Sequence, residues 1–81
     1  MSYFVYLVKC SDGSYYCGYT NDVDKRVSEH NNSYKGAKYT RGRRPVKLAY
    51  VEEVDTRSAG MKREHAIKRM SHANKAKLGY T

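Results

Sequence analysis

The segment from Tyr3 to Thr20 constrains the fold of this chain most, because it has the pattern of a β-hairpin. Residues 3–10 form a run of β-branched and aromatic side chains, and the same composition returns in residues 15–20. Between these runs, Ser11-Asp12-Gly13 suits a three-residue loop in which the glycine takes a left-handed conformation. We therefore expect two antiparallel strands joined by a tight turn.

The length of that loop decides which side chains share a face of the hairpin. With a three-residue loop, Tyr6 faces Gly18 across the ladder. Val8 then faces Tyr16, so the two tyrosines are diagonal neighbours on one face and within reach of each other. A two-residue Asp12-Gly13 loop slips the register by one and puts the tyrosines on opposite faces. We favour the first register, which brings two phenols together.

The composition favours an anionic partner. The 81 residues carry 16 Lys plus Arg against 8 Asp plus Glu, for a net charge of +8, and their number fits one domain over residues 1–81. This charge favours nucleic acid, although basic surfaces also serve solubility or membrane contact. Because no apolar stretch could span a bilayer and the N-terminus lacks a signal-peptide pattern, we expect a cytoplasmic protein. We interpret Cys10 and Cys17 as small buried residues on opposite faces of the hairpin.

The rest of the chain predicts a third strand and three helices. Capping residues precede the helices, and neither glycine nor proline interrupts the first of them. The expected elements are a helix over residues 23–31, a strand over 46–54, a helix over 57–70 and a helix over 71–78. Together with the hairpin they give the order β-β-α-β-α-α.

Two polar side chains border the buried stripe of the first expected helix. Val23 and Val27 define that stripe at a spacing of four residues, and Arg26 and His30 lie beside it. We expect both to border the sheet. A purely structural interpretation is also open, in which Arg26 reaches along the surface and His30 fills the rim of the core.

The second expected helix carries an isolated carboxylate. Glu64 is the only acid after Thr56 in the sequence and projects at the edge of the apolar stripe. A structural alternative is an ion pair with Lys68, four residues further on, or charge balance for Arg63.

The segment over residues 32–45 combines turn-forming residues with cations and contains no acid. Cations neutralise phosphates and aromatic rings stack on exposed bases, so this mixture suits nucleic-acid contact, with a plain solvated loop as the alternative. The candidate contacts are Lys35, Lys38, Tyr39, Arg41, Arg43 and Arg44.

These side chains are the kinds that phosphodiester cleavage needs. We expect one sheet face to gather the two phenols, Arg26, His30 and Glu64. A tyrosine acts as a base only where cations favour its phenolate, and Arg26, Lys9 and a bound metal would provide them. One carboxylate, Glu64, suits a single hydrated Mg²⁺ and makes a two-metal scheme unlikely.

The same residues resemble the motifs of the GIY-YIG nuclease superfamily, in particular its small stand-alone bacterial members of the YhbQ-like or YazA-like group. The resemblance covers nearly the whole chain. It is carried by Phe4-Val5-Tyr6, Tyr16-Cys17-Gly18, Thr20-Asn21-Asp22-Val23, Arg26-Val27-Ser28-Glu29-His30-Asn31, Gly36-Ala37-Lys38-Tyr39-Thr40-Arg41, Arg43-Arg44-Pro45, Lys62-Arg63-Glu64 and Ile67-Lys68. Phe4 and Cys17 depart from the motifs, where the family has glycine and isoleucine.

The resemblance implies an α/β (α+β) fold with a three-stranded antiparallel sheet flanked by helices. It also implies roles in catalysis: Tyr6 as general base or activator of the attacking water, Tyr16 assisting it, Arg26 stabilising phosphate charge, His30 supporting, and Glu64 as ligand of Mg²⁺ or Mn²⁺. Lys38, Tyr39 and Asn74 are then further candidates for substrate contact.

The expected function is a metal-dependent endonuclease on DNA, with structured or damaged DNA as the expected substrate and a protein partner for targeting. One alternative is a nucleic-acid-binding adaptor without turnover. A second is a protein-interaction domain whose basic surface meets an acidic partner. The joint presence of Tyr6, Tyr16, Arg26 and Glu64 favours the enzyme, because an adaptor needs only the cations.

Overall fold

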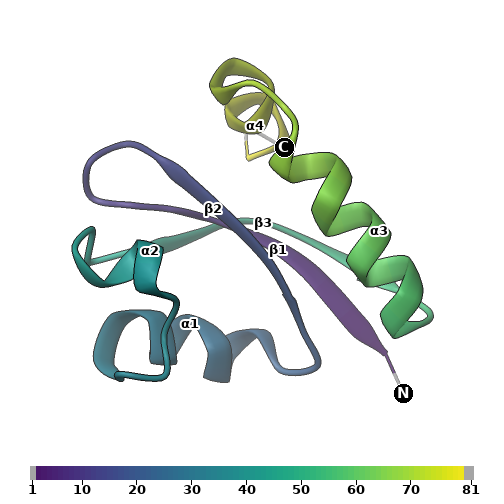
Figure 1. Cartoon of the computed structure of the whole chain (residues 1–81), viewed down its shortest axis with the longest axis horizontal. Helices are drawn as coiled ribbons and strands as arrows, with labels where there is room; N and C mark the ends of the chain where they lie inside the picture. Colours follow the sequence, from purple (N-terminus) through teal and green to yellow (C-terminus); the bar gives the residue numbers. More distant parts are fainter. Residues whose placement is uncertain (1, 80–81) are drawn as a thin grey trace.

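A computed structural model describes residues 2–79 and contains one antiparallel sheet with helices on both of its faces (Figure 1). The strands lie in the order β2-β1-β3, with β1 in the centre. This is the α+β fold that we expected. In chain order, the elements are β1 Tyr3–Lys9, β2 Tyr15–Thr20, α1 Val23–Asn32, α2 Lys38–Arg41, β3 Lys47–Val54, α3 Arg57–Lys68 and α4 His72–Leu78.

The hairpin has the predicted three-residue loop. Gly13 has a φ of 87° and donates its N–H to the carbonyl of Cys10, and Cys10 N–H donates to Ser14 at 2.7 Å. Tyr6 pairs with Gly18. The two tyrosines therefore share a face, which confirms the favoured register.

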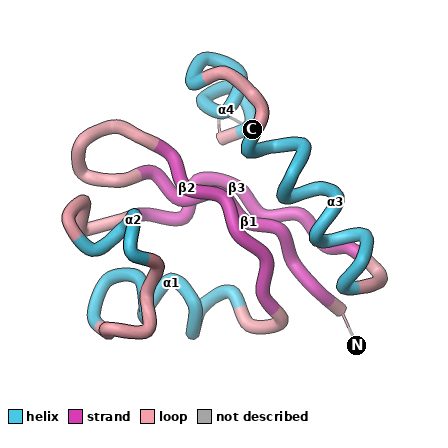
Figure 2. Tube along the Cα trace, viewed as in Figure 1, coloured by secondary structure: helices cyan, strands magenta, loops and turns pink. Residues whose placement is uncertain are grey.

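Each face of the sheet has its own core, and a different pair of helices lies on each face (Figure 2). Helix α3 packs on one face, where its Ile67 joins the core of that side, and Leu78 of α4 packs against the same core. Helix α1 packs on the other face through Val27. The first core consists of Val5, Leu7, Cys17 and Ile67, and the second of Tyr6, Val8, Cys10 and Val46. The two cysteines are buried, unbonded and on opposite faces, as predicted.

The structure differs from the sequence prediction in the basic segment and, by one or two residues, at several helix and strand ends. Residues 38–41 form the short helix α2, which we expected to be loop. This segment can lie against α1 because Gly36 has no side chain: a Cβ there would be 2.7 Å from the carbonyl oxygen of Glu29. Helix α3 ends two residues earlier than predicted, and β3 starts one residue later.

Candidate active site

The centre of the site is a hydrogen bond between Tyr6 on β1 and His30 on α1. Tyr6 Oη and His30 Nε2 are 2.7 Å apart, and both residues are at most 1% exposed. Tyr16 on β2 meets the same imidazole edge to face, with ring centroids 5.2 Å apart. His30 is thus part of the core rather than its rim, and it joins the two phenols into one cluster.

Helix α2 holds the other side of the imidazole. His30 Nδ1 lies 3.0 Å from Thr40 Oγ1, and the Ala37 N–H donates to Nδ1 at 3.3 Å. A backbone N–H can only donate, so Nδ1 is the acceptor in its contact with Ala37, while the Thr40 hydroxyl donates to the Ala37 carbonyl at 2.9 Å. Sequence reasoning missed Thr40, because a single threonine in a basic segment carries no periodic signal. The orientation of His30 is therefore set by α2.

Burial shifts the pKa values of both members of this pair. It raises the pKa of Tyr6 from 10.0 to about 12, while the neighbouring Arg26 guanidinium lowers it in part. Burial, together with the charge of Arg26, lowers the pKa of His30 from 6.5 to about 4. At neutral pH both side chains are therefore uncharged.

Arg26 lies beside the phenol of Tyr6, as the sequence predicted for the sheet side of α1. Its Nη1 nitrogen contacts Glu29 Oε1 at 3.1 Å and the carbonyl of Lys35 at 2.9 Å. A guanidinium carries five N–H donors, so these two bonds leave donors on the other nitrogens. The arrangement fixes a half-buried cation next to the two tyrosines.

Gly18 makes the space that the phenol of Tyr6 occupies. A Cβ at this position would lie 2.5 Å from Tyr6 Oη and 2.7 Å from Cζ. The side chain of Tyr6 is held by His30 and cannot move aside without losing that bond. The glycine of Tyr16-Cys17-Gly18 is thus required by a contact across the ladder.

Aromatic and cationic groups cover Tyr16. The ring of Tyr39 from α2 stacks on it with centroids 5.9 Å apart, and the Arg43 guanidinium lies 4.0 Å above the Tyr39 ring. From the other side, the Nζ atom of Lys68 on α3 lies 5.7 Å from the centre of the Tyr16 ring. Tyr16 is therefore the point where α2 and α3 approach each other across the edge strand β2.

Glu64 approaches Tyr16 from a different face of the sheet from the one expected. It lies on α3, which packs on the face opposite to α1, so the expectation that one sheet face gathers the whole set is wrong. Instead, Glu64 meets the cluster at the edge of β2 through Lys68, with Oε1 and Nζ 3.1 Å apart. The ion pair that the sequence offered as a structural alternative is thus present.

Lys9 does not lie on the tyrosine face. It pairs with Tyr15 in the ladder, and Tyr15 packs against the α3 core. Because side chains alternate along a strand, Lys9 points away from Tyr6. The expectation that Lys9 favours the phenolate is wrong, and Arg26 is the neighbouring cation that acts on that phenol.

The cations of the basic segment divide into two groups. Arg44 is half-buried, and its guanidinium contacts the carbonyls of Glu29, His30 and Ser33 at the end of α1. Arg43 bonds Asp12 in the hairpin loop at 3.0 Å. These two arginines hold α2 and the loop in place. The exposed cations are Lys35, Lys38 and Arg41, and Tyr39 is exposed beside them. Arg41 donates to the carbonyl of Tyr34.

Asn74 lies apart from the basic segment. It is exposed in the first turn of α4, where its backbone N–H donates to the Ser71 cap. Helix α4 packs on the α3 side of the sheet. A substrate contact at Asn74 would therefore need a ligand that extends over that side.

The donor set fits a metal ion that keeps most of its water. Over residues 2–79, no group of three or more His, Cys, Asp or Glu side chains could hold a metal ion. Glu64 offers one carboxylate, 20% exposed and held by the flexible side chain of Lys68. Mg²⁺ commonly binds through one or two carboxylates and substrate phosphates, so this set fits such an ion.

Over residues 2–79, no helix is long and apolar enough to cross a membrane.

Known proteins match nearly the whole of the chain. Residues 2–77 match the GIY-YIG catalytic domain. A UPF0213 protein of Halobacterium salinarum is 55% identical over 74 residues, covering 91% of this chain and 95% of that protein. One from Staphylococcus saprophyticus is 53% identical over 76 residues, covering 94% and 92%.

Two solution NMR structures share the fold. A UPF0213 protein from Bacillus halodurans superposes with a TM-score of 0.59 at 44% identity, covering 96% of this chain and 82% of that one. A protein from E. faecalis gives a TM-score of 0.64 at 43% identity, with 95% and 81% covered. The nucleases of this family typically use divalent metals. On the family match and these relatives, the chain belongs to the GIY-YIG family.

Proposed function

We propose that this protein is an endonuclease that hydrolyses phosphodiester bonds in DNA with the help of a divalent metal ion. The observation that carries the proposal is the bond between Tyr6 and His30, which places a buried phenol and a neutral imidazole beside the half-buried Arg26. Membership of the GIY-YIG family supports the reaction class.

In the proposed mechanism, Tyr6 is the general base. Tyr6 is an uncharged phenol in the free protein and would lose its proton to solvent when substrate and metal bring further positive charge to the site. The phenolate would then take a proton from the attacking water. The hydroxide attacks phosphorus, the bond to the leaving oxygen breaks, and that oxygen takes up a proton from solvent. The Nε2–H of His30 and the guanidinium of Arg26 stabilise the phenolate. Arg26 also faces the charge that develops on the phosphate, and Tyr16 orients the water from the edge of the site.

Glu64 would hold the metal ion. When bound, Mg²⁺ or Mn²⁺ supplies positive charge that neutralises the phosphate oxygens. Lys68 occupies the carboxylate in the structure, so binding requires that the flexible lysine move away or share it.

The exposed side chains of the basic segment would contact the substrate. Lys35, Lys38 and Arg41 would neutralise backbone phosphates, and Tyr39 would leave its stack on Tyr16 to admit the strand. Movement of Tyr39 would also open the path to Tyr6, which is 1% exposed in the structure.

The test is cleavage of single-stranded, duplex, flapped and branched DNA, and of the matching RNAs, with Mg²⁺, Mn²⁺ or EDTA. Wild type is compared with Tyr6→Phe and Glu64→Gln, and Glu53→Gln is the control because Glu53 is exposed on β3, away from the cluster. We expect metal-dependent products that fall at least about 100-fold in the first two variants. The control should cut as wild type does. Cleavage that survives Tyr6→Phe and Glu64→Gln in folded protein would contradict the proposal.

A specific observation favours one alternative, a nucleic-acid-binding adaptor without turnover. Tyr6 is almost fully buried and Lys68 already pairs with Glu64, as in a site that does not react. If the protein is an adaptor, wild type and Glu64→Gln should bind nucleic acid equally well, and neither should give a product with Mg²⁺ or Mn²⁺.

A further inference from the structure

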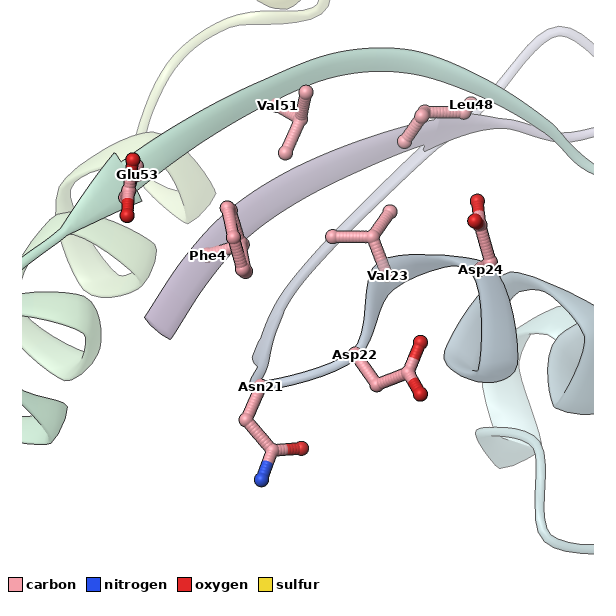
Figure 3. Close-up of a pocket in the computed structure, with 8 residues that line it drawn as sticks. All are labelled: Phe4, Asn21, Asp22, Val23, Asp24, Leu48, Val51 and Glu53. Carbon is pink, nitrogen blue, oxygen red and sulfur yellow. The ribbon is translucent and has the colours of Figure 1, made fainter. Parts of the chain in front are cut away.

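Behind α1, the sheet face carries an apolar groove that the proposed chemistry does not use. The groove measures about 540 Å³ and lies between β1, β3 and the first turn of α1 (Figure 3). Phe4, Leu48 and Val51 form its floor along the strands, and Val23 of α1 faces them. The groove lies toward β3, while Tyr16 of the tyrosine cluster lies on β2 at the other edge of the sheet; the groove borders the cluster at Val51, which pairs with Tyr6.

This floor leaves large apolar side chains in contact with water. Leu48 is 43% exposed and Val51 44%, and together they are two of the five large hydrophobic residues that the described chain exposes. Scattered exposed apolar residues need no explanation, but grouped ones rimmed by polar groups mark interaction sites. Here both line one hollow, which indicates a surface that a ligand covers.

The rim of the groove is acidic in a chain whose net charge is +8. Asp22, Asp24 and Glu53 line it, and no basic residue does. Among the described residues, the four salt bridges use other acids, namely Asp12, Glu29, Glu52 and Glu64. Asp22 Oδ1 accepts the Lys25 N–H as the cap of α1, so Asp24 and Glu53 are the rim acids available to a cationic ligand. Outside the rim, Asp55 is the one acid that takes part in none of these four salt bridges.

These two properties together exclude several ligands. A nucleic-acid backbone would be repelled by three carboxylates. A metal ion is not favoured, since the described residues contain no cluster of ligands that could hold one. A second copy of this chain would bring another +8 charges, so self-association is opposed by repulsion.

We propose that this groove docks a segment of a partner protein in which apolar side chains are flanked by lysine or arginine. The apolar side chains would cover Leu48, Val51 and Phe4, and the cations would meet Asp24 and Glu53 at the rim. Because the groove lies toward β3 and Tyr16 lies on β2 at the other edge of the sheet, the partner and a nucleic acid bound at Tyr16 and Tyr39 would not compete. This inference does not rest on the proposed nuclease activity.

The probe is a synthetic helical peptide of about 15 residues built from leucine and lysine, with a peptide of leucine and glutamate as its counterpart. Each is titrated into the isotopically labelled full chain and followed by amide and methyl NMR shifts, with the affinity measured by calorimetry. The variants are Val51→Lys and Glu53→Lys. Met61→Lys is the matched control, because Met61 is 50% exposed but lies on α3, on the opposite face.

We expect the lysine peptide to shift the resonances of Phe4, Val23, Leu48 and Val51, and to bind at least about tenfold more weakly to Val51→Lys and Glu53→Lys. Met61→Lys should bind as wild type does, and thermal unfolding should show that all three variants fold. Absence of binding, equal binding of the glutamate peptide, or equal affinity in the groove variants would overturn the proposal. So would dimerisation of the free chain through the same residues, because the occupant would then be a second copy.

Discussion

At the scale of single residues, the site depends on a contact between a glycine and a phenol. Gly18 lies opposite Tyr6 in the ladder, and the missing side chain leaves the space in which the phenol bonds His30. The sequence predicted this pairing from the loop length. It gave no sign that the phenol would be fully buried, because burial depends on α1 and on the contacts of α2.

Replacing Gly18 with alanine should displace the phenol of Tyr6. The new Cβ would be 2.5 Å from Oη, so either the ring or the strand must shift. Overpacking of this kind costs about 1–3 kcal/mol of unfolding free energy. Urea denaturation measures it. Gly42→Ala is the control, since nothing lies within 4 Å of a Cβ at that position and its effect should stay within about 0.5 kcal/mol.

His30 should make the protein less stable in acid. The pKa of His30 is about 4 in the fold and 6.5 for an unperturbed histidine, so the unfolded chain binds a proton between these pH values and the folded chain does not. The contribution is complete above pH 6.5 and is lost as the pH falls toward 4. This lowered pKa corresponds to a contribution of roughly 3 kcal/mol to the free energy of unfolding at neutral pH. Urea denaturation at a series of pH values measures this loss.

The comparison variant for this prediction is His30→Gln, which keeps a hydrogen-bonding group and cannot titrate in this range. It should be less stable than wild type at neutral pH, and its stability should fall less between pH 6.5 and 4. An equal fall in both proteins would show that other groups, such as carboxylates, cause the acid sensitivity.

At the scale of elements, the sequence predicted the strands and longer helices but not α2. The hairpin, the third strand and the capped helices have local signals in loop residues, alternation and capping side chains. Helix α2 has only four residues, and it forms against α1 through His30, Thr40 and the close approach at Gly36. Such contacts are long-range, so no local pattern in residues 32–45 predicts them.

Within that segment, Arg44 and Lys38 should differ in what they do. Arg44 binds the last carbonyls of α1, so Arg44→Ala should lower the free energy of unfolding by about 1–2 kcal/mol. Lys38 is exposed, so Lys38→Ala should leave stability unchanged. If Lys38 contacts a phosphate, its loss should reduce the salt dependence of nucleic-acid binding by about one unit of slope. A loss of stability in Lys38→Ala with none in Arg44→Ala would contradict these two roles.

At the scale of the whole molecule, the candidate site is assembled across an edge of the sheet. Tyr6, Arg26 and His30 come from the α1 face, while Glu64 comes from α3 on the other face and meets Tyr16 through Lys68 at β2. The sequence showed that Glu64 borders an apolar stripe. It could not show which face of the sheet α3 covers, because α3 has the same apolar stripe whichever face it packs on.

The measurement that tests this account most directly is single-turnover cleavage of the best substrate by wild type and Glu64→Gln, with binding measured on the same samples. If hydrolysis needs groups from both faces of the sheet, Glu64→Gln should bind the substrate with an affinity similar to that of wild type. It should leave the substrate uncut in the presence of Mg²⁺ or Mn²⁺. If Glu64→Gln cuts at the wild-type rate, Glu64 holds no catalytic metal, and the site does not extend across β2.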